Sequence, residues 1–179
     1  MTIIAYSKGQ LAGDRMGIVG YGRSATIQDT VKVFKSKCGR FAYGIAGDAF
    51  VEGEREGLME LVFRQLLVHN ASDGEVELKL SGTDAMNVMG VMDRNIIFMT
   101  STRAWRIQSS KYLEITHLDG YCSGNGSWMA DVCLKYGLSA ADTVKEVMLL
   151  QTDCGGSGMD VVDASDLIPL FDPEVAPNE

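Results

Sequence analysis

The first part of the chain alternates apolar and polar residues over short stretches, which predicts antiparallel strands. The first two stretches are separated by Lys8 and Gly9, a pair that favours a tight hairpin turn. Residues 17–22 are rich in glycine, and we expect a loop there that returns to the sheet. The strands predicted in this part of the chain are residues 2–8, 10–16, 30–34 and 41–46.

Apolar residues at helical spacing predict three helices. The first covers residues 49–69, with Asp48 as its N-cap. The second covers residues 126–136, where Trp128, Met129, Val132, Cys133 and Tyr136 share one face. The third follows Ser139, which forms a capping box with Asp142.

The remaining apolar stretches have strand character. Residues 85–92 and 95–101 are predicted to form a hairpin, followed by β-type residues at 105–117, a segment at 121–126 that closes the same sheet, and a last strand at 159–163. The order is therefore strands, helix, strands, two helices and strand. This segregation predicts an α+β layered domain and not a parallel βαβ fold.

Length and charge narrow the class of protein. The 179 residues are enough for one domain, predicted at 1–166, with an acidic tail at 167–179 that contains all three prolines. The net charge of −8 argues against nucleic-acid and anionic-membrane partners. No apolar run approaches the ~20 residues of a membrane span, and a signal-peptide layout is missing. We therefore expect a cytoplasmic protein.

The four cysteines, at positions 38, 122, 133 and 154, are scattered without CxxC spacing. Neither a metal site nor a disulfide framework is predicted from this arrangement.

Thr2 is the first residue with candidate chemistry. It follows the initiator Met, and a small second residue permits removal of that Met. Removal would place a hydroxyl and a free α-amine on the same residue, so that the amine can take the hydroxyl proton while the oxygen attacks a carbonyl. The α-amine has an ordinary pKa near ~7.7–8, so much of it is neutral at physiological pH.

Further motifs follow Thr2 in a defined order. Together they resemble the proteasome-type N-terminal-nucleophile hydrolases, in particular the proteasome β-subunits and HslV-like peptidases, over roughly residues 2–165. This resemblance implies a four-layer αββα sandwich and assembly into rings. The matching segments are Thr2-Ile3-Ile4-Ala5, Ala12-Gly13-Asp14-Arg15, Val31-Lys32-Val33, Gly44-Ile45-Ala46-Gly47 and 120–126.

The resemblance also implies roles for single residues. Thr2 matches the nucleophile, and Lys32 matches the lysine whose charge disfavours protonation of the amine. Asp14 matches the acid that pairs with this lysine. Gly47 matches the residue whose backbone N–H faces the oxyanion, and Ser123 matches the serine near the terminal amine.

Each of these residues also has a purely structural interpretation. Asp14 and Arg15 are typical of a turn with a local ion pair, and Lys32 of a solvated strand position. Gly47 fits a strand-to-helix junction, and Ser123 fits a turn hydroxyl. Their joint order after Thr2 favours the catalytic interpretation.

The sequence departs from the family pattern in three places. The family segment Asp-x-x-Ser-Gly-Gly reads Thr152-Asp153-Cys154-Gly155-Gly156, so Cys154 takes the place of the serine. Either Asp153 or Gln151 would replace the acid, and Asp153 is included among the predicted catalytic residues. Residues 71–84 are too short for the family's second long helix, which predicts a shortened helical layer. Finally, a retained Met1 would block the amine.

The expected function is a threonine-type endopeptidase that acts on unfolded polypeptides inside a homo-oligomeric ring, with an ATP-dependent unfoldase as an optional partner. No cofactor and no metal are implied. Two alternatives stay open at this point. One is an inactive proteasome-like scaffold that retains Met1, and the other is an N-terminal-nucleophile amidase with a small-molecule substrate.

Overall fold

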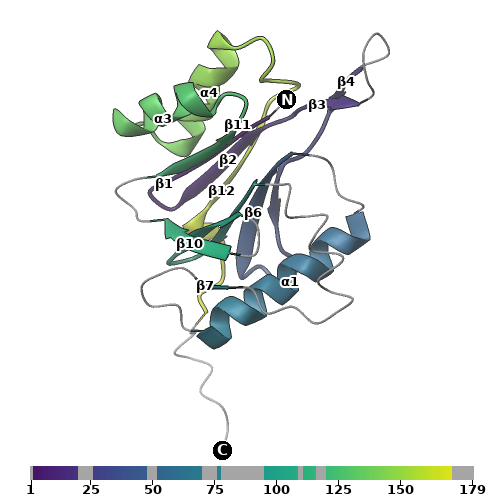
Figure 1. Cartoon of the computed structure of the whole chain (residues 1–179), viewed down its shortest axis with the longest axis vertical. Helices are drawn as coiled ribbons and strands as arrows, with labels where there is room; N and C mark the ends of the chain where they lie inside the picture. Colours follow the sequence, from purple (N-terminus) through teal and green to yellow (C-terminus); the bar gives the residue numbers. More distant parts are fainter. Residues whose placement is uncertain are drawn as a thin grey trace, which may run out of the picture.

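The computed structural model describes residues 2–19, 26–47, 52–69, 76–77, 95–108, 111–115 and 120–170. Its described elements alternate in the predicted order of strands, helix, strands, two helices and strand (Figure 1). The α+β class expected from the sequence is confirmed.

A four-stranded antiparallel sheet contains the N-terminal hairpin at its centre. The hairpin turns at Lys8 and Gly9, whose φ angles of 51° and 77° are those of a type I′ turn. This turn confirms the hairpin predicted from the sequence. In spatial order, the strands are β11 (Tyr121–Gly124), β1 (Ile3–Ser7), β2 (Gln10–Asp14) and β12 (Met159–Asp163).

The second sheet has six strands, all in antiparallel pairs. In spatial order, they are β5 (Val33–Lys35), β6 (Phe41–Ala46), β8 (Asn95–Thr100), β9 (Ala104–Gln108), β10 (Lys111–Ile115) and β7 (Val76–Glu77).

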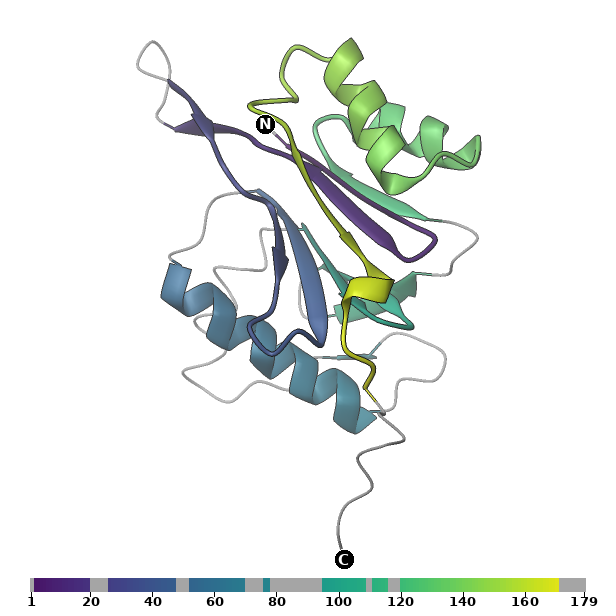
Figure 2. The same cartoon turned by 180° about the vertical axis from the view of Figure 1, so that it is seen from behind.

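A separate two-stranded arm projects from the body of the molecule (Figure 2). It is formed by β3 (Met16–Val19) and β4 (Thr26–Asp29). The loop predicted at 17–22 is therefore wrong for residues 17–19, because these glycine-flanked residues still pair with β4. Residues 20–22 lie outside the described part of the chain.

The helices cover opposite sides of the two sheets. Helix α1 (Glu52–His69) lies on the six-stranded sheet, while α3 (Ser127–Lys135) and α4 (Ala140–Leu150) lie on the four-stranded sheet (Figure 1). Ser139 caps α4 by accepting a hydrogen bond from the Asp142 backbone N–H at 3.1 Å, as predicted. The predicted Asp48 cap of α1 lies outside the described residues.

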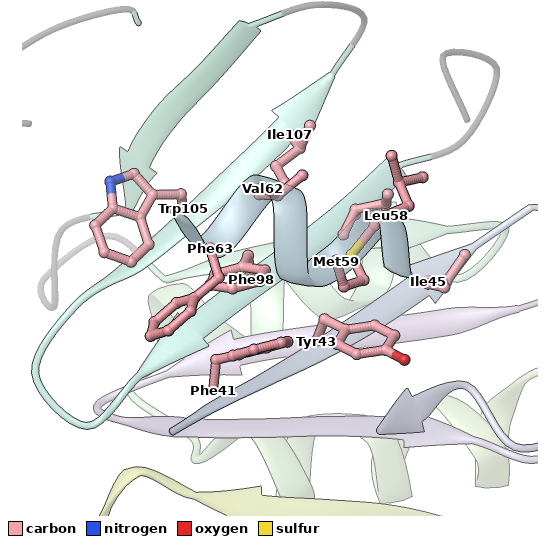
Figure 3. Packing of buried hydrophobic residues seen from close by; sticks show 11 residues of the cluster. Phe41, Tyr43, Ile45, Leu58, Met59, Val62, Phe63, Phe98, Trp105 and Ile107 are labelled. Carbon is pink, nitrogen blue, oxygen red and sulfur yellow. The ribbon is translucent and has the colours of Figure 1, made fainter. Parts of the chain in front are cut away.

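Three apolar clusters hold these layers together. Many large aromatic side chains lie between α1 and its sheet, where the rings of Phe41, Phe63 and Phe98 contact one another (Figure 3). A second cluster joins the two sheets through residues such as Ile4 and Ile97. The third, between the four-stranded sheet and the helix pair, consists mainly of small residues: Ile3, Ala5, Ala12, Ala130, Ala140, Val144, Val147 and Cys154.

Tertiary pairing changes some of the predicted strands. Residues 121–124 do not close the sheet of the preceding strands but pair with β1 in the other sheet. The predicted strand 30–34 begins only at Val33, although the Lys32 carbonyl already accepts a hydrogen bond from the Ile45 N–H of β6. The single β segment predicted at 105–117 is the hairpin β9–β10.

A hairpin was also predicted between residues 85–92 and 95–101. The second of these segments contains β8, which pairs with β6 and β9, while residues 85–92 lie outside the described part.

The chain after β12 continues along the body as a short 3-10 turn, Ala164–Asp166. Leu167 is buried between the sheets, and the Ile168 N–H donates to the Gly39 carbonyl at 2.9 Å. Residues up to 170 therefore pack on the domain, while the rest of the predicted tail lies outside the described residues. Among the described helices, none is long and apolar enough to cross a bilayer.

Candidate active site

Thr2 lies at the start of the central strand β1 and is buried. Its carbonyl accepts a hydrogen bond from the Asn125 N–H at 2.8 Å, beyond the last paired residue of β11. The next residue along, Ile3, donates its N–H to Asp14 Oδ1 at 2.9 Å. The peptide group that joins Thr2 to Ile3 is thus held at both its carbonyl and its N–H, which restricts the orientation of Thr2.

Gly124 allows this close approach of β11 to Thr2. Its φ is +118°, and a Cβ at this position would lie 1.9 Å from the Thr2 carbonyl oxygen. Any other residue here would push the strands apart. Ser123, which is buried, precedes it and pairs with Ile4 in the register of the sheet. The structure therefore brings Ser123 to the strand beside Thr2.

Lys32 and Asp14 form a buried ion pair. The distance from Nζ to Oδ1 is 2.6 Å, and the side chains are 6% and 0% exposed. Nζ also donates to the Met16 carbonyl. Burial lowers the pKa of Lys32 below its usual value, and the hydrogen bond and charge of Asp14 oppose this shift. A cation with these partners is held next to the start of β1.

The Asp14 carboxylate connects three segments. Oδ1 accepts from Lys32 Nζ and from the Ile3 N–H, while Oδ2 accepts from the Gly155 N–H at 2.8 Å. Three donors on one buried carboxylate satisfy most of its acceptor sites and offset the cost of its burial. Asp14 therefore binds the N-terminal strand, the lysine and the loop before β12 into one unit.

Gly47 follows the last residue of β6 and is exposed, with a φ of +128°. Its place is fixed through β6, because the Ile45 N–H donates to the Lys32 carbonyl at 2.9 Å. Gly47 is thus tied to the segment that carries the lysine, and its role at an oxyanion stays a prediction.

The loop between α4 and β12 contains Gln151, Asp153 and Cys154, the residues at which the sequence departs from the pattern of the family that it resembles. Cys154 is buried, and its Sγ lies 3.6 Å from the side-chain amide of Gln151. Burial, followed by the charges of Asp14 and Asp153, raises the pKa of the Cys154 thiol to about 11. The thiol is therefore protonated at neutral pH.

Asp153 is half-buried in this loop beside the side-chain amide of Gln151. The described contacts link Asp14 to Gly155 instead. The structure thus brings Thr2, Asp14, Lys32 and Ser123 together, while Asp153 takes part in a neighbouring network. Its catalytic assignment stays a prediction.

Backbone groups complete the site in ways that the sequence did not indicate. The Met16 carbonyl and the Gly155 N–H are ligands of the charge pair. Backbone donors and acceptors are present at every position, so no residue type marks them. The glycine pair at 155–156 was the only local signal: a Cβ on Gly156 would lie 2.7 Å from the Arg15 carbonyl carbon.

Comparison by sequence gave no match to known family models or to curated proteins. Comparison of the structure gave similar folds. Eukaryotic HslV from Trypanosoma brucei has a TM-score of 0.56 and 14% identity over 90% of this chain and 98% of that chain. BPH from Thiobacillus denitrificans has a TM-score of 0.50 and 14% identity over 92% and 98%, respectively. The chain therefore shares the fold of these proteins.

Proposed function

We propose that this chain is a threonine-type peptidase of the proteasome-like class, with Thr2 as its nucleophile after removal of Met1. The observation that carries the proposal is the buried Lys32–Asp14 pair at the start of β1, where Asp14 also holds the residue after Thr2. A buried ion pair is expensive to maintain and is weakly stabilising at best. A role in catalysis explains why it is placed beside Thr2.

In the proposed reaction, the α-amine of Thr2 takes the proton of its own hydroxyl, and Oγ1 attacks the carbonyl carbon of a peptide bond. The Lys32 cation disfavours protonation of the amine before the attack. The Gly47 N–H stabilises the oxyanion, a contribution of ~3–4 kcal/mol for a well-placed donor. The amine then returns the proton to the leaving nitrogen, and water hydrolyses the resulting ester to regenerate Thr2.

The proposed assembly is the homo-oligomeric ring of this class, built from four-layer αββα subunits, with polypeptide substrates and an ATP-dependent unfoldase as an optional partner. Exposed side chains support an assembly of subunits, because Trp128 on α3 and Tyr136 at the C-cap of this helix are 65% and 84% exposed. Large aromatic side chains of this kind commonly anchor contacts between proteins. Leu58 on α1 cannot make such a contact, because it is buried between this helix and the six-stranded sheet.

Peptide hydrolysis by the purified protein and by its Thr2→Ala variant tests this function. We expect Thr2→Ala to abolish turnover without loss of the fold, and Thr2→Ser to retain part of it because the hydroxyl and amine survive. Undiminished turnover of Thr2→Ala would exclude Thr2 as the nucleophile.

Two further measurements separate the alternatives. Intact mass spectrometry of the mature protein should show the loss of one Met, and a retained Met would indicate an inactive scaffold. Light scattering should give a mass far above 19.4 kDa. A monomer at micromolar concentration would contradict the ring and favour an amidase with a small-molecule substrate.

A further inference from the structure

A hydrogen-bonded network connects the surface of α3 with the loop that carries Cys154. The side-chain amide of Gln151 accepts from the indole Nε1 of Trp128 at 2.9 Å and donates to Asp153 Oδ1 at 3.2 Å. This orientation satisfies both neighbours, since an indole only donates and a carboxylate only accepts. The Sγ atom of Cys154 lies 3.6 Å from the same amide.

The other side of Cys154 is tied to the charge pair. The N–H of Gly155, the next residue, donates to Asp14 Oδ2 at 2.8 Å, and the Gly155 carbonyl accepts from the Arg15 N–H at 2.9 Å. Cys154 is therefore held between two fixed points, the Gln151 amide and the Asp14 carboxylate.

Packing leaves little freedom in this region. Gly126 lies beside the network, and a Cβ there would be 3.3 Å from Cys154 Sγ and 3.4 Å from the Gln151 amide nitrogen that faces Asp153. Small side chains on the facing strands and helices bring the backbone close to the thiol. A change in the direction of the Gln151 amide would therefore move Cys154, because the surrounding space cannot absorb it.

We propose that Trp128 and Gln151 are positioning residues that hold the Cys154 thiol against the Lys32–Asp14 pair. The catalytic consequence of this inference rests on the proposed function. The position of the thiol does not depend on that function. A carboxylate at position 151 cannot replace the amide, because it has no donor for Asp153 and adds a like charge beside it. The bridging amide is what joins an indole donor to a carboxylate acceptor.

The placement is tested by the rate at which iodoacetamide alkylates Cys154 at pH 8, measured on the Cys154 peptide by mass spectrometry. Trp128→Phe removes the indole N–H at an exposed position, and Gln151→Met removes the amide with similar length. We expect both variants to raise the rate about five- to tenfold, the change typical of one lost hydrogen bond. Alkylation of the exposed Cys38 should not change.

Tyr136→Phe is the matched control, because Tyr136 is exposed at the C-cap of the same helix and has no described contact with the network. It should leave the Cys154 rate unchanged. A Cys154 rate in Trp128→Phe equal to that of the parent protein would overturn the proposal. The Trp128→Phe variant tests the proposal on its own if Gln151→Met does not fold.

The catalytic consequence is tested by peptide hydrolysis with the same variants. We expect Trp128→Phe to lower kcat about five- to tenfold with KM unchanged, and Tyr136→Phe to alter neither. Faster alkylation with an unchanged kcat would overturn the positioning role. If the parent protein hydrolyses no peptide while alkylation still responds, the proposed function fails but the placement of Cys154 by Trp128 and Gln151 stands.

Discussion

The two helical sides of the molecule are packed in different ways. Under α1, the cluster consists of large side chains, with the rings of Phe41 and Phe98 4.9 Å apart (Figure 3). Under α3 and α4, it consists mainly of alanine, valine and cysteine. Large rings contribute much buried apolar area, whereas small residues let helices and loops approach the sheet closely.

The loop before β12, which completes the candidate site, lies on the side with small residues. Cys154 belongs to that cluster, and Gly155 reaches Asp14 from the same loop. We therefore expect the α1 side to contribute most to stability, while the loop on the α3–α4 side supplies a backbone donor to Asp14. Substitutions on the two sides should separate these contributions.

The largest effect is expected for Lys32→Ala. Turnover should fall by at least about two orders of magnitude, because the charge that tunes the amine is lost. The free energy of unfolding should also fall by about 3–5 kcal/mol, since Asp14 is left buried without its ion-pair partner. Steady-state kinetics and denaturant unfolding measure the two effects. Asp14→Asn should reduce turnover similarly, and a change in KM alone would make both residues ordinary structural charges.

Phe98→Ala should lower the free energy of unfolding by about 3–5 kcal/mol, because a fully buried ring that contacts other rings is replaced by a cavity. Below the melting temperature, kcat should remain near that of the parent protein. Val144→Ala on the opposite side is the comparison, with a loss of roughly 2 kcal/mol. An equal loss of unfolding free energy in both variants would contradict the larger contribution of the α1 side to stability.

Gly126→Ala should cost about 1–3 kcal/mol of stability through overpacking, because its Cβ would lie 2.4 Å from Val147 Cγ1. The matched control is Gly57→Ala in α1, where nothing lies within 4 Å of the added Cβ. There the substitution should stabilise by about 0.5–1 kcal/mol through helix propensity. Thermal unfolding should show a lower melting temperature for Gly126→Ala and a higher one for Gly57→Ala. A lower melting temperature for Gly57→Ala would contradict the open space around that position.

The smallest effect concerns alkaline pH. Burial raises the pKa of Cys154 from 9.0 to about 11, so the folded state keeps a proton that the unfolded state loses above pH 9. Stability should therefore fall as the pH rises from 9 toward 11. The lowered pKa of Lys32 has the opposite effect on stability below pH 10.5. There the unfolded state binds more protons than the folded state, so stability rises with pH. Denaturant unfolding at pH 8 and pH 10 should show a smaller loss for Cys154→Ala than for the parent protein.

Features that depend on a few neighbouring residues could be predicted from the sequence. The turn at Lys8 and Gly9 follows from the residues that tolerate positive φ, and the cap at Ser139 from its spacing to Asp142. Helix and strand periods gave the α+β class. The order of the motifs also indicated an HslV-like fold, which the structural comparison supports.

Features that depend on distant partners were decided by the tertiary structure. Residues 121–126 were predicted in the sheet of the preceding strands, but β11 pairs with β1. Strand pairing joins residues that are far apart in the sequence, so local patterns do not identify the partner. It expected a loop at 17–22, where Met16–Val19 pair with β4. The outward face of Trp128 and its contact with Gln151 were equally invisible, since helical period identifies a face but not what covers it.

The same distinction holds for the candidate site. The residue types of Thr2, Asp14, Lys32 and Ser123 and their order could be found in the sequence, because the chemistry requires those side chains. Their burial, the three hydrogen bonds to Asp14 and the contact of Gly124 with Thr2 depend on how β1, β2, β11 and the loop before β12 meet. Side-chain chemistry is a property of single residues, whereas distance and burial arise only when separate segments pack together.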